Sequence, residues 1–158
     1  MRRIFLACLA AVLAGCSGQY NPPKGGGNAA PGRFIHAAIY KTIAPWDGAA
    51  VHLVLSEQPL HEQNKYSLGP HVAVRIYQAT IDLSRRRIRL EGKESRQGSA
   101  MWNRKGGEAT PLVWADIDFQ EIQEGKPVTG RYELEFPDGT REQGRFEAAW
   151  WAGEGRGG

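Results

Sequence analysis

Asp116 and Asp118 are the residues whose type and spacing come nearest to acid–base chemistry. Side chains two positions apart on an extended strand point to the same face, so both carboxyl groups would share one surface. Two carboxyl groups about 5–10 Å apart can hydrolyse a glycosidic bond when they flank a sugar. The same spacing also arises on any solvated strand face, and no second segment supplies an obvious partner acid. A hydrolase that uses this pair is therefore the third of three candidate functions.

Nucleophilic and metal chemistry has less support in the sequence. There is no Gly-x-Ser-x-Gly motif and no glycine-rich loop that opens a helix to cradle phosphate. The histidines show neither His-x-His nor i, i+4 spacing, which are typical of metal ligands; they are His36, His52, His61 and His71. We expect exposed or half-buried histidines on strands, and we predict no metal, no cofactor and no catalytic centre.

Arg85, Arg87 and Arg89, with Arg86 among them, form the strongest charge cluster in the chain. Guanidinium groups at this density can hold an anion such as a lipid phosphate or an acidic polymer. Arginines at the end of a hairpin can also keep an edge strand solvated and protect it from pairing with other chains. We favour the solvated hairpin end and keep Arg85, Arg87 and Arg89 as possible binding residues.

Two of the five tryptophans are candidates for a binding face. Trp46 lies in the turn-like segment Ala44-Pro45-Trp46-Asp47-Gly48, and Trp151 follows Trp150 at the end of the last predicted strand. Neighbouring strand residues face opposite sides, so one of the last two indoles enters the core and the other faces out. Exposed rings on a β domain can stack on sugars or fill a partner's pocket, and packing at the core and its rim is the alternative.

The elements that position these residues are predicted to be β-strands, because apolar residues recur at every second position rather than with the helical period. Turn-forming residues separate the candidate strands, which span residues 34–40, 49–56, 71–81, 87–91, 101–102, 112–119, 128–136 and 142–151. Residues 82–85 are expected to turn the chain, so that residues 87–91 return with Ile88 and Leu90 facing inward. Seven to eight short strands predict an all-β domain, a single antiparallel β-sandwich or barrel, over residues 33–151.

The last two predicted strands also suggest a register. Apolar and charged side chains alternate on both sides of Pro137-Asp138-Gly139. A pairing of Tyr132 with Phe146 and of Glu133 with Arg145 places apolar groups together and opposite charges together. We therefore predict this register, with a longer turn or a bulge in place of a tight two-residue loop.

The start of the chain predicts where the domain is held. Arg2 and Arg3 precede the ten apolar residues 4–13, a stretch too short to cross a ~30 Å hydrocarbon core as a helix. The ending Leu13-Ala14-Gly15-Cys16 resembles the lipobox of bacterial lipoproteins. The resemblance implies a signal peptide over residues 1–15, cleavage before Cys16, and lipid on Cys16, palmitate included. Ser17 stands where Asp would retain many proteobacterial lipoproteins at the inner membrane, which implies the periplasmic face of the outer membrane.

The composition of the chain indicates the nature of the segments on either side of the predicted domain, its net charge and its cysteine content. Residues 16–32 are rich in Gly and Pro and predict a flexible tether with a reach of roughly 20–25 Å, whereas residues 152–158 predict a disordered tail. Loss of Arg2 and Arg3 with the leader leaves eighteen basic and seventeen acidic residues, a net charge of +1 that argues against a nucleic-acid partner. With Cys8 cleaved off and Cys16 lipidated, the domain has no thiol for a disulfide, a zinc site or a nucleophile.

A second resemblance is local. The segment Trp102-Asn103-Arg104-Lys105-Gly106-Gly107-Glu108-Ala109-Thr110 is similar to the Trp-x-Lys-Gly-x-Glu-Ala segment of membrane-bound lysozyme inhibitors, which are small β-barrel lipoproteins. One extra residue separates Trp102 from Lys105, and the chain has no counterpart of that family's disulfide cysteines or of its Ser-Gly-x-x-Tyr loop. The resemblance implies that Lys105 is an inhibitory contact.

These observations favour a membrane-anchored periplasmic lipoprotein with a non-catalytic role in binding or envelope maintenance. A lysozyme-inhibitor-like or glycan-binding β module is the alternative, and a hydrolase that uses Asp116 and Asp118 is the third. The expected partners are the membrane, through the lipid on Cys16, and an envelope protein or a glycan.

Overall fold

The computed structural model describes residues 32–44, 48–64, 69–77, 83–91, 95–104 and 108–152. These residues form nine strands and one short 3-10 helix, η1 (Glu62–Asn64). The prediction of an all-β domain is confirmed. The strands are β1 (His36–Ala44), β2 (Gly48–Ser56), β3 (His71–Tyr77), β4 (Arg87–Glu91), β5 (Gly98–Asn103), β6 (Thr110–Pro111), β7 (Trp114–Phe119), β8 (Val128–Glu135) and β9 (Arg141–Trp150).

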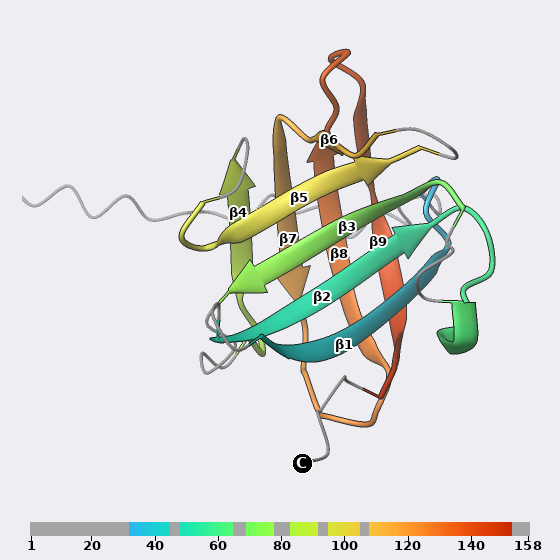
Figure 1. The fold of residues 1–158 in the computed structure, drawn as a ribbon, viewed down its shortest axis with the longest axis vertical. Helices are drawn as coiled ribbons and strands as arrows, with labels where there is room; N and C mark the ends of the chain where they lie inside the picture. Colours follow the sequence, from blue (N-terminus) through green and yellow to red (C-terminus); the bar gives the residue numbers. More distant parts are fainter. Residues whose placement is uncertain are drawn as a thin grey trace, which may run out of the picture.

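The nine strands of the described residues belong to one sheet, in the order β4-β7-β8-β9-β1-β2-β3-β5-β6 (Figure 1). The prediction of seven to eight antiparallel strands is therefore wrong in both number and direction. The extra strand is the two-residue β6, which pairs with β5. The first and last long strands lie side by side and run in the same direction, with Ala37 opposite Ala148, so the sheet is mixed.

β4 does not return against β3, as the turn at residues 82–85 had suggested. It pairs with β7, and β3 pairs with β5 instead. The chain before β4 is held to the end of β7, because the Phe119 N–H donates to the Arg86 carbonyl at 3.0 Å. Ser84 extends the attachment: its Oγ accepts from the Ile122 N–H at 2.8 Å. Ile88 and Leu90 do face inward, as predicted.

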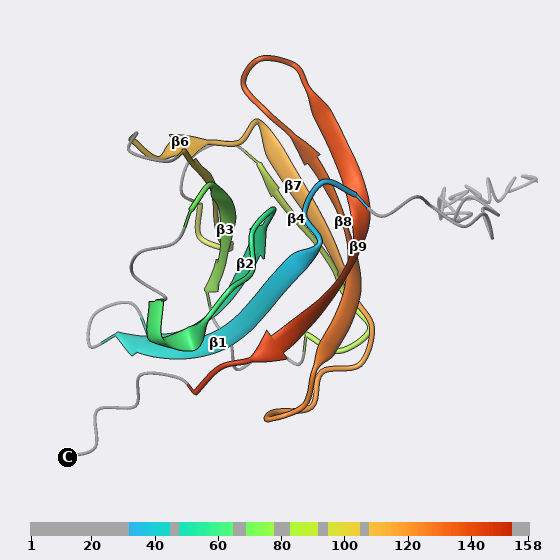
Figure 2. The same ribbon diagram turned by 90° about the vertical axis from the view of Figure 1, so that its right-hand side faces the viewer.

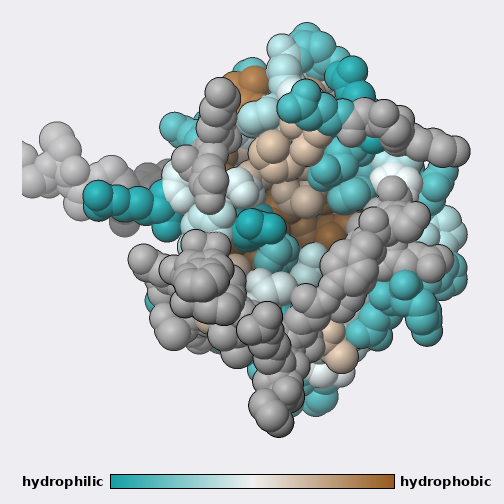
Figure 3. Space-filling view, viewed as in Figure 1, coloured by the Kyte–Doolittle hydropathy of each residue, from teal (hydrophilic) through white to brown (hydrophobic). Residues whose placement is uncertain are grey.

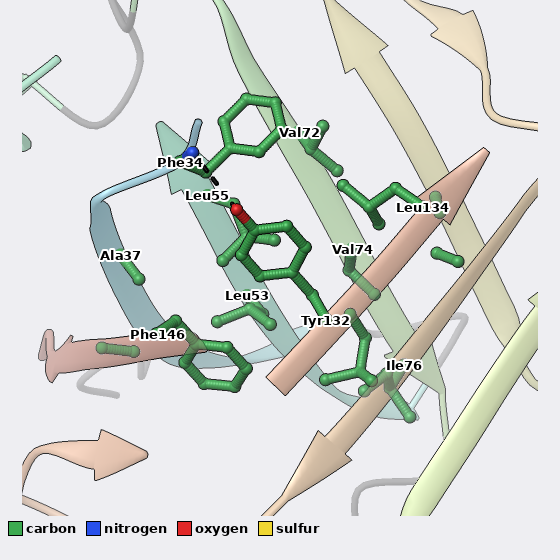
Figure 4. Close-up of a cluster of buried hydrophobic side chains, with 14 of the residues drawn as sticks. Phe34, Ala37, Leu53, Leu55, Val72, Val74, Ile76, Tyr132, Leu134 and Phe146 are labelled. Atoms are coloured by element: carbon green, nitrogen blue, oxygen red, sulfur yellow. Dashed lines mark hydrogen bonds between the residues drawn. The ribbon is translucent and has the colours of Figure 1, made fainter. Parts of the chain in front are cut away.

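The sheet curls into a half-barrel in which β1, β2 and β3 face β7, β8 and β9 across the core (Figure 2). The predicted alternation along β3 is confirmed, since Val72, Val74 and Ile76 are buried in the same core cluster as Leu53 and Tyr132 (Figure 4). Burial of a Val, Leu, Ile or Phe side chain contributes about 1.5–3 kcal/mol each. These side chains fill the concave side of the sheet, which leaves the convex side as the surface available for function.

The segment before β1 closes one end of this core. Phe34 is fully buried, and its ring lies 5.9 Å from the Tyr132 ring, edge to face. The Phe34 N–H donates to the Tyr132 hydroxyl at 3.2 Å, the bond drawn in Figure 4. Burial raises the pKa of Tyr132 to about 12, so its hydroxyl stays protonated. Arg33 forms an ion pair with Glu57 and lies over the Trp102 ring, so the chain is fixed to the domain from this point.

The final hairpin corrects the predicted register. Tyr132 pairs with Gly144, and Phe146 pairs with Gly130, a shift of two residues from the expected partners. A shift of two keeps every side chain on its predicted face. Its physical reason is space, because a Cβ on Gly144 would lie 2.6 Å from the Tyr132 hydroxyl oxygen. Each large ring therefore lies over a glycine of the partner strand.

The turn of this hairpin is longer than two residues, as predicted. The Phe136 N–H donates to the Thr140 carbonyl at 2.9 Å, and the Gly139 N–H donates to the Phe136 carbonyl at 2.9 Å. Gly139 has a φ of 82°, the left-handed conformation that Gly adopts at low cost. A type I turn followed by a glycine in this conformation is a common three-residue hairpin connection.

Candidate functional site

The convex face of β1, β2, β3 and β5 is where the described side chains leave a substantial hollow. Register places its outward-facing residues in rows that cross the strands. One row is polar and contains Tyr40, His52, Arg75 and Ser99. The next row is apolar and contains Ala38, Val54, Ala73, Met101 and Pro111. The face therefore sets an apolar band directly beside a polar one.

A pocket of about 410 Å³ opens where these two rows cross β2, β3 and β5. Figure 3 shows this face, with a hollowed apolar floor bordered by hydrophilic residues. We call it the outer-face pocket, and its described lining is His52, Ala73, Arg75, Tyr77, Ser99, Met101 and Pro111. Its volume falls within the range of small-molecule sites, which are mostly apolar with a few polar groups that orient the ligand.

His52 is the titratable side chain that packing holds most firmly at this pocket. Its ring stacks on Tyr40 at 4.7 Å between centroids, and its Nε2 lies 2.9 Å from the Thr42 hydroxyl. Burial, reinforced by the positive charge of Arg75, lowers the pKa of His52 from 6.5 to about 4. The imidazole is therefore neutral near pH 7 and can either donate or accept a hydrogen bond.

Arg75 is the one charged side chain in the described lining of the outer-face pocket, and it is exposed. Strands β1, β2, β3 and β5 contain no acidic residue at all. Within the part of the chain that the structure describes, no ion pair joins Arg75 to a carboxylate. The pocket consequently has a positive charge at its polar border that no carboxylate of the described residues pairs with.

Gly98 brings β5 close enough to β3 to form this part of the pocket. It pairs with Ile76 and has a φ of 151°, a backbone conformation that residues other than glycine rarely adopt. A Cβ at this position would clash with the Arg75 carbonyl oxygen. Ser95 fixes the approach, because its Oγ accepts from the Gly98 N–H at 3.2 Å. Gly98 thus allows Ser99 to stand directly beside Arg75.

The predicted arginine cluster lies elsewhere, around a second pocket of about 240 Å³ between the end of β3 and the starts of β4 and β5. We call it the seam pocket; Arg86, Arg87 and Arg89 line it with Ile76, Tyr77, Leu83, Ile88 and Gln97. Arg85 is outside this lining and stands 4.0 Å from the Glu121 carboxylate. The cluster therefore combines three guanidinium groups at one pocket and leaves the fourth at the surface.

Two of the three arginines of the seam pocket, Arg87 and Arg89, already have negative or aromatic partners. Arg87 Nε donates to the Asp116 carboxylate at 2.7 Å. Arg89 Nε lies 2.9 Å from the Glu91 carboxylate, and its guanidinium stands 4.7 Å from the centre of the Trp114 ring. These contacts compensate much of the positive charge, and they link β4 to β7 through side chains.

The two predicted catalytic aspartates do share the convex face of β7, but in different environments. Asp116 is buried and bonded to Arg87, whereas Asp118 is exposed. Neither lines the outer-face pocket or the seam pocket. The Asp116 carboxyl group thus belongs to the ion pairs between β4 and β7, and the Asp118 carboxyl group lies beside them on the same charged surface.

The tryptophans separate as the strand period predicts. Trp150 packs against the core, and Trp151 lies on the opposite side, stacked on Tyr40 at 6.0 Å. Trp151 is only 5% exposed, so its ring has little free surface for stacking on a ligand. Trp102, which begins the segment similar to lysozyme inhibitors, is buried against Phe34 and Phe136.

Three candidate residues, Cys16, Trp46 and Lys105, lie outside the described residues. The predicted signal peptide, nearly all of the predicted tether, and the predicted tail beyond Ala152 lie outside them as well. Among the described residues, no group of three or more His, Cys, Asp and Glu side chains could hold a metal ion. The same residues include no helix long and apolar enough to cross a membrane.

Sequence reasoning missed the outer-face pocket. Of its lining, only His52 was considered, and it was interpreted as an ordinary strand histidine. A signal was present in the sequence, because Ala50 and Val54 in residues 49–56 and Ala73 in residues 71–77 are apolar residues at outward positions. Apolar residues on the outer face of a strand indicate that something packs or binds there.

Comparison with known proteins gives no relative from which to transfer a role. No family model matches the chain, and neither a curated protein nor a solved structure matches it.

Proposed function

We propose that this chain is a membrane-anchored lipoprotein whose β domain binds a small, largely apolar ligand in the outer-face pocket without transforming it. The observation that carries the proposal is the pocket itself, with an apolar floor of Ala73, Met101 and Pro111 and a polar border. An apolar pocket of this size with a few convergent polar groups is the usual form of a small-molecule site.

The arrangement of polar groups favours binding over catalysis. A serine nucleophile needs its base within hydrogen-bond reach, about 2.6–3.2 Å. Ser99 and His52 share a row, but β3 stands between their strands. Two strand spacings place them roughly 9–10 Å apart. His52 is bonded to Thr42 instead, so the one histidine in the described lining of the pocket is not a base for Ser99.

The membrane anchor is supported by the sequence. The charged start, the short apolar run and Leu13-Ala14-Gly15-Cys16 agree with a lipoprotein signal, and Ser17 favours the outer membrane. Sixteen residues then separate Cys16 from Arg33, where the chain is fixed to the domain. A flexible tether of this length would give the domain a reach of roughly 20–25 Å from its lipid.

The binding role is tested with phenylnaphthylamine, a neutral apolar probe whose fluorescence rises when it leaves water. The protein is the mature chain from residue 16 onward with Cys16→Ser, which removes lipid into which the probe would otherwise partition. We expect saturable binding of one probe per chain. Ala73→Phe should weaken this binding about tenfold, a change of about 1.4 kcal/mol, because the larger ring fills the pocket floor.

Ala149→Phe is the matched control, since Ala149 is exposed on β9, three strands away from β3. Binding by this variant should stay within about twofold of the parent chain. Absence of saturable binding, or equal losses in the two variants, would remove the pocket as the functional site.

A further inference from the structure

The outer-face pocket divides its lining between two chemistries. Ala73 and Met101 are cross-strand neighbours that continue to Pro111, and Arg75 and Ser99 are cross-strand neighbours in the next row. Adjacent rows on one face of a strand lie about 6–7 Å apart. A ligand that satisfies the pocket therefore needs an apolar body with a polar group at one edge.

The charge at that edge is positive. Arg75 supplies it, and no acidic residue occurs on β1, β2, β3 or β5. On the convex face of the other strands, three arginines are matched with acids: Arg87 with Asp116, Arg89 with Glu91, and Arg141 with Glu135. Among the described ion pairs Arg75 has no counterpart, so a bound anion would supply it.

From this placement we propose that the ligand is an acidic amphiphile, with its apolar body over Ala73, Met101 and Pro111 and its acid group against Arg75 and Ser99. This inference rests on the proposed function and specifies its ligand class. The Arg75 guanidinium can donate two parallel hydrogen bonds to a carboxylate, sulfonate or phosphate, and the Ser99 hydroxyl can add another. His52, neutral and fixed by Thr42 and Tyr40, offers a further polar contact without adding charge.

The seam pocket is less suited to the same ligand. It is smaller, about 240 Å³ against about 410 Å³, and two of its three guanidinium groups already contact carboxylates. An anion there would have to compete with Asp116 and Glu91, whereas at the outer-face pocket it has no carboxylate competitor among the described residues.

The inference is tested by comparing two probes that share one body. Anilinonaphthalene sulfonate is phenylnaphthylamine with an added sulfonate, so their affinity ratio isolates the contribution of the acid group. The mature Cys16→Ser chain should bind the sulfonate about tenfold more tightly, because a hydrogen bond to a charged group is roughly twice as strong as a neutral one. Arg75→Gln should bring the ratio close to one, whereas Arg75→Lys should keep part of the preference.

Arg131→Gln is the control, since Arg131 is an exposed arginine on the convex face of β8. It should keep the full preference for the sulfonate. A ratio near one in the parent chain, or a ratio that Arg75→Gln does not change, would overturn the inference while phenylnaphthylamine binding still upholds the pocket. Loss of binding by both probes in the parent chain would instead reject the proposed function.

Unlabelled competitors separate the two kinds of acidic amphiphile. Displacement by dodecanoate indicates an acyl chain, and displacement by naphthoate indicates a flat ring. Either result supports the inference if dodecanol and naphthylmethanol displace the probe poorly. Equal displacement by the alcohols would count against it. As a second readout, the sulfonate should raise the pKa of His52 in an NMR titration by offsetting Arg75, and the neutral probe should not.

Discussion

His52 makes the stability of the domain depend on pH. Its pKa is about 4 in the folded protein and near 6.5 when unfolded, mainly because burial disfavours the charged imidazole. Between these values the unfolded chain binds a proton that the folded chain does not, so folding loses free energy as the pH falls from 6.5 toward 4. Above pH 6.5 this contribution is fully present. We expect urea midpoints to fall across this window.

The residue responsible can be identified by substitution. His52→Gln keeps a partner for the Thr42 hydroxyl but cannot titrate, so it should flatten the dependence between pH 6.5 and 4. His36→Gln removes a histidine at the far end of the same face and should retain the slope. If both variants showed the parent slope, another group would be responsible.

The glycines beneath the aromatic rings specify how β8 and β9 pair. Gly144 lies under Tyr132, and Gly130 lies under Phe146. Gly144→Ala should destabilise the domain by about 1–3 kcal/mol, because the new methyl group would have to displace the Tyr132 ring from a packed core. Chemical denaturation of the parent chain and the variant measures this change directly.

Gln143→Ala provides the comparison on the same strand. Gln143 is exposed, and a surface substitution of this kind usually changes stability by less than about 0.5 kcal/mol. Equal denaturation midpoints for Gly144→Ala and Gln143→Ala would show that the glycine is not required for packing.

The same hairpin shows how far sequence periodicity reaches. Alternation correctly placed Tyr132, Leu134 and Phe146 on the inner face, because the side-chain period of a strand is two. It could not distinguish two registers that differ by two residues, since both keep the faces intact. The deciding feature was the volume available opposite each ring, which appears only when specific glycines are paired with specific aromatics.

Strand partners and the pocket escaped prediction for a related reason. β4 follows β3 in the sequence but pairs with β7. β1 pairs with β9, although they are the first and last strands in the sequence. The outer-face pocket likewise collects His52, Arg75 and Ser99 from three separate segments. Local patterns determine which residues form strands, whereas long-range packing determines which strands become neighbours.

On the scale of the whole molecule, the predicted lipid and the folded domain should be separable. Cys16→Ser should release a soluble, folded protein into the periplasm, because the buried core that the structure describes begins at Phe34. Fractionation of the envelope and a thermal denaturation curve of the released protein measure the two properties.

Ser17→Asp in the lipidated chain should move the protein to the inner membrane, as the sorting resemblance implies.

An unfolded released protein would mean that the membrane supports the fold, and a chain that stayed with the outer membrane would mean that Cys16 is not the anchor. The control is Ser17→Ala with Cys16 intact, which should remain both folded and in the outer-membrane fraction.

The attachment at Phe34 and the position of β1 have a mechanical consequence. β1 is hydrogen-bonded on both sides, antiparallel to β2 and parallel to β9. A pull along this strand, transmitted from the chain before Gly32, would strain two ladders in shear, so that many bonds must break together rather than one after another. Phe34 must also leave the core before β1 can slide. The domain is therefore built to resist tension at the end from which the proposed tether would depart.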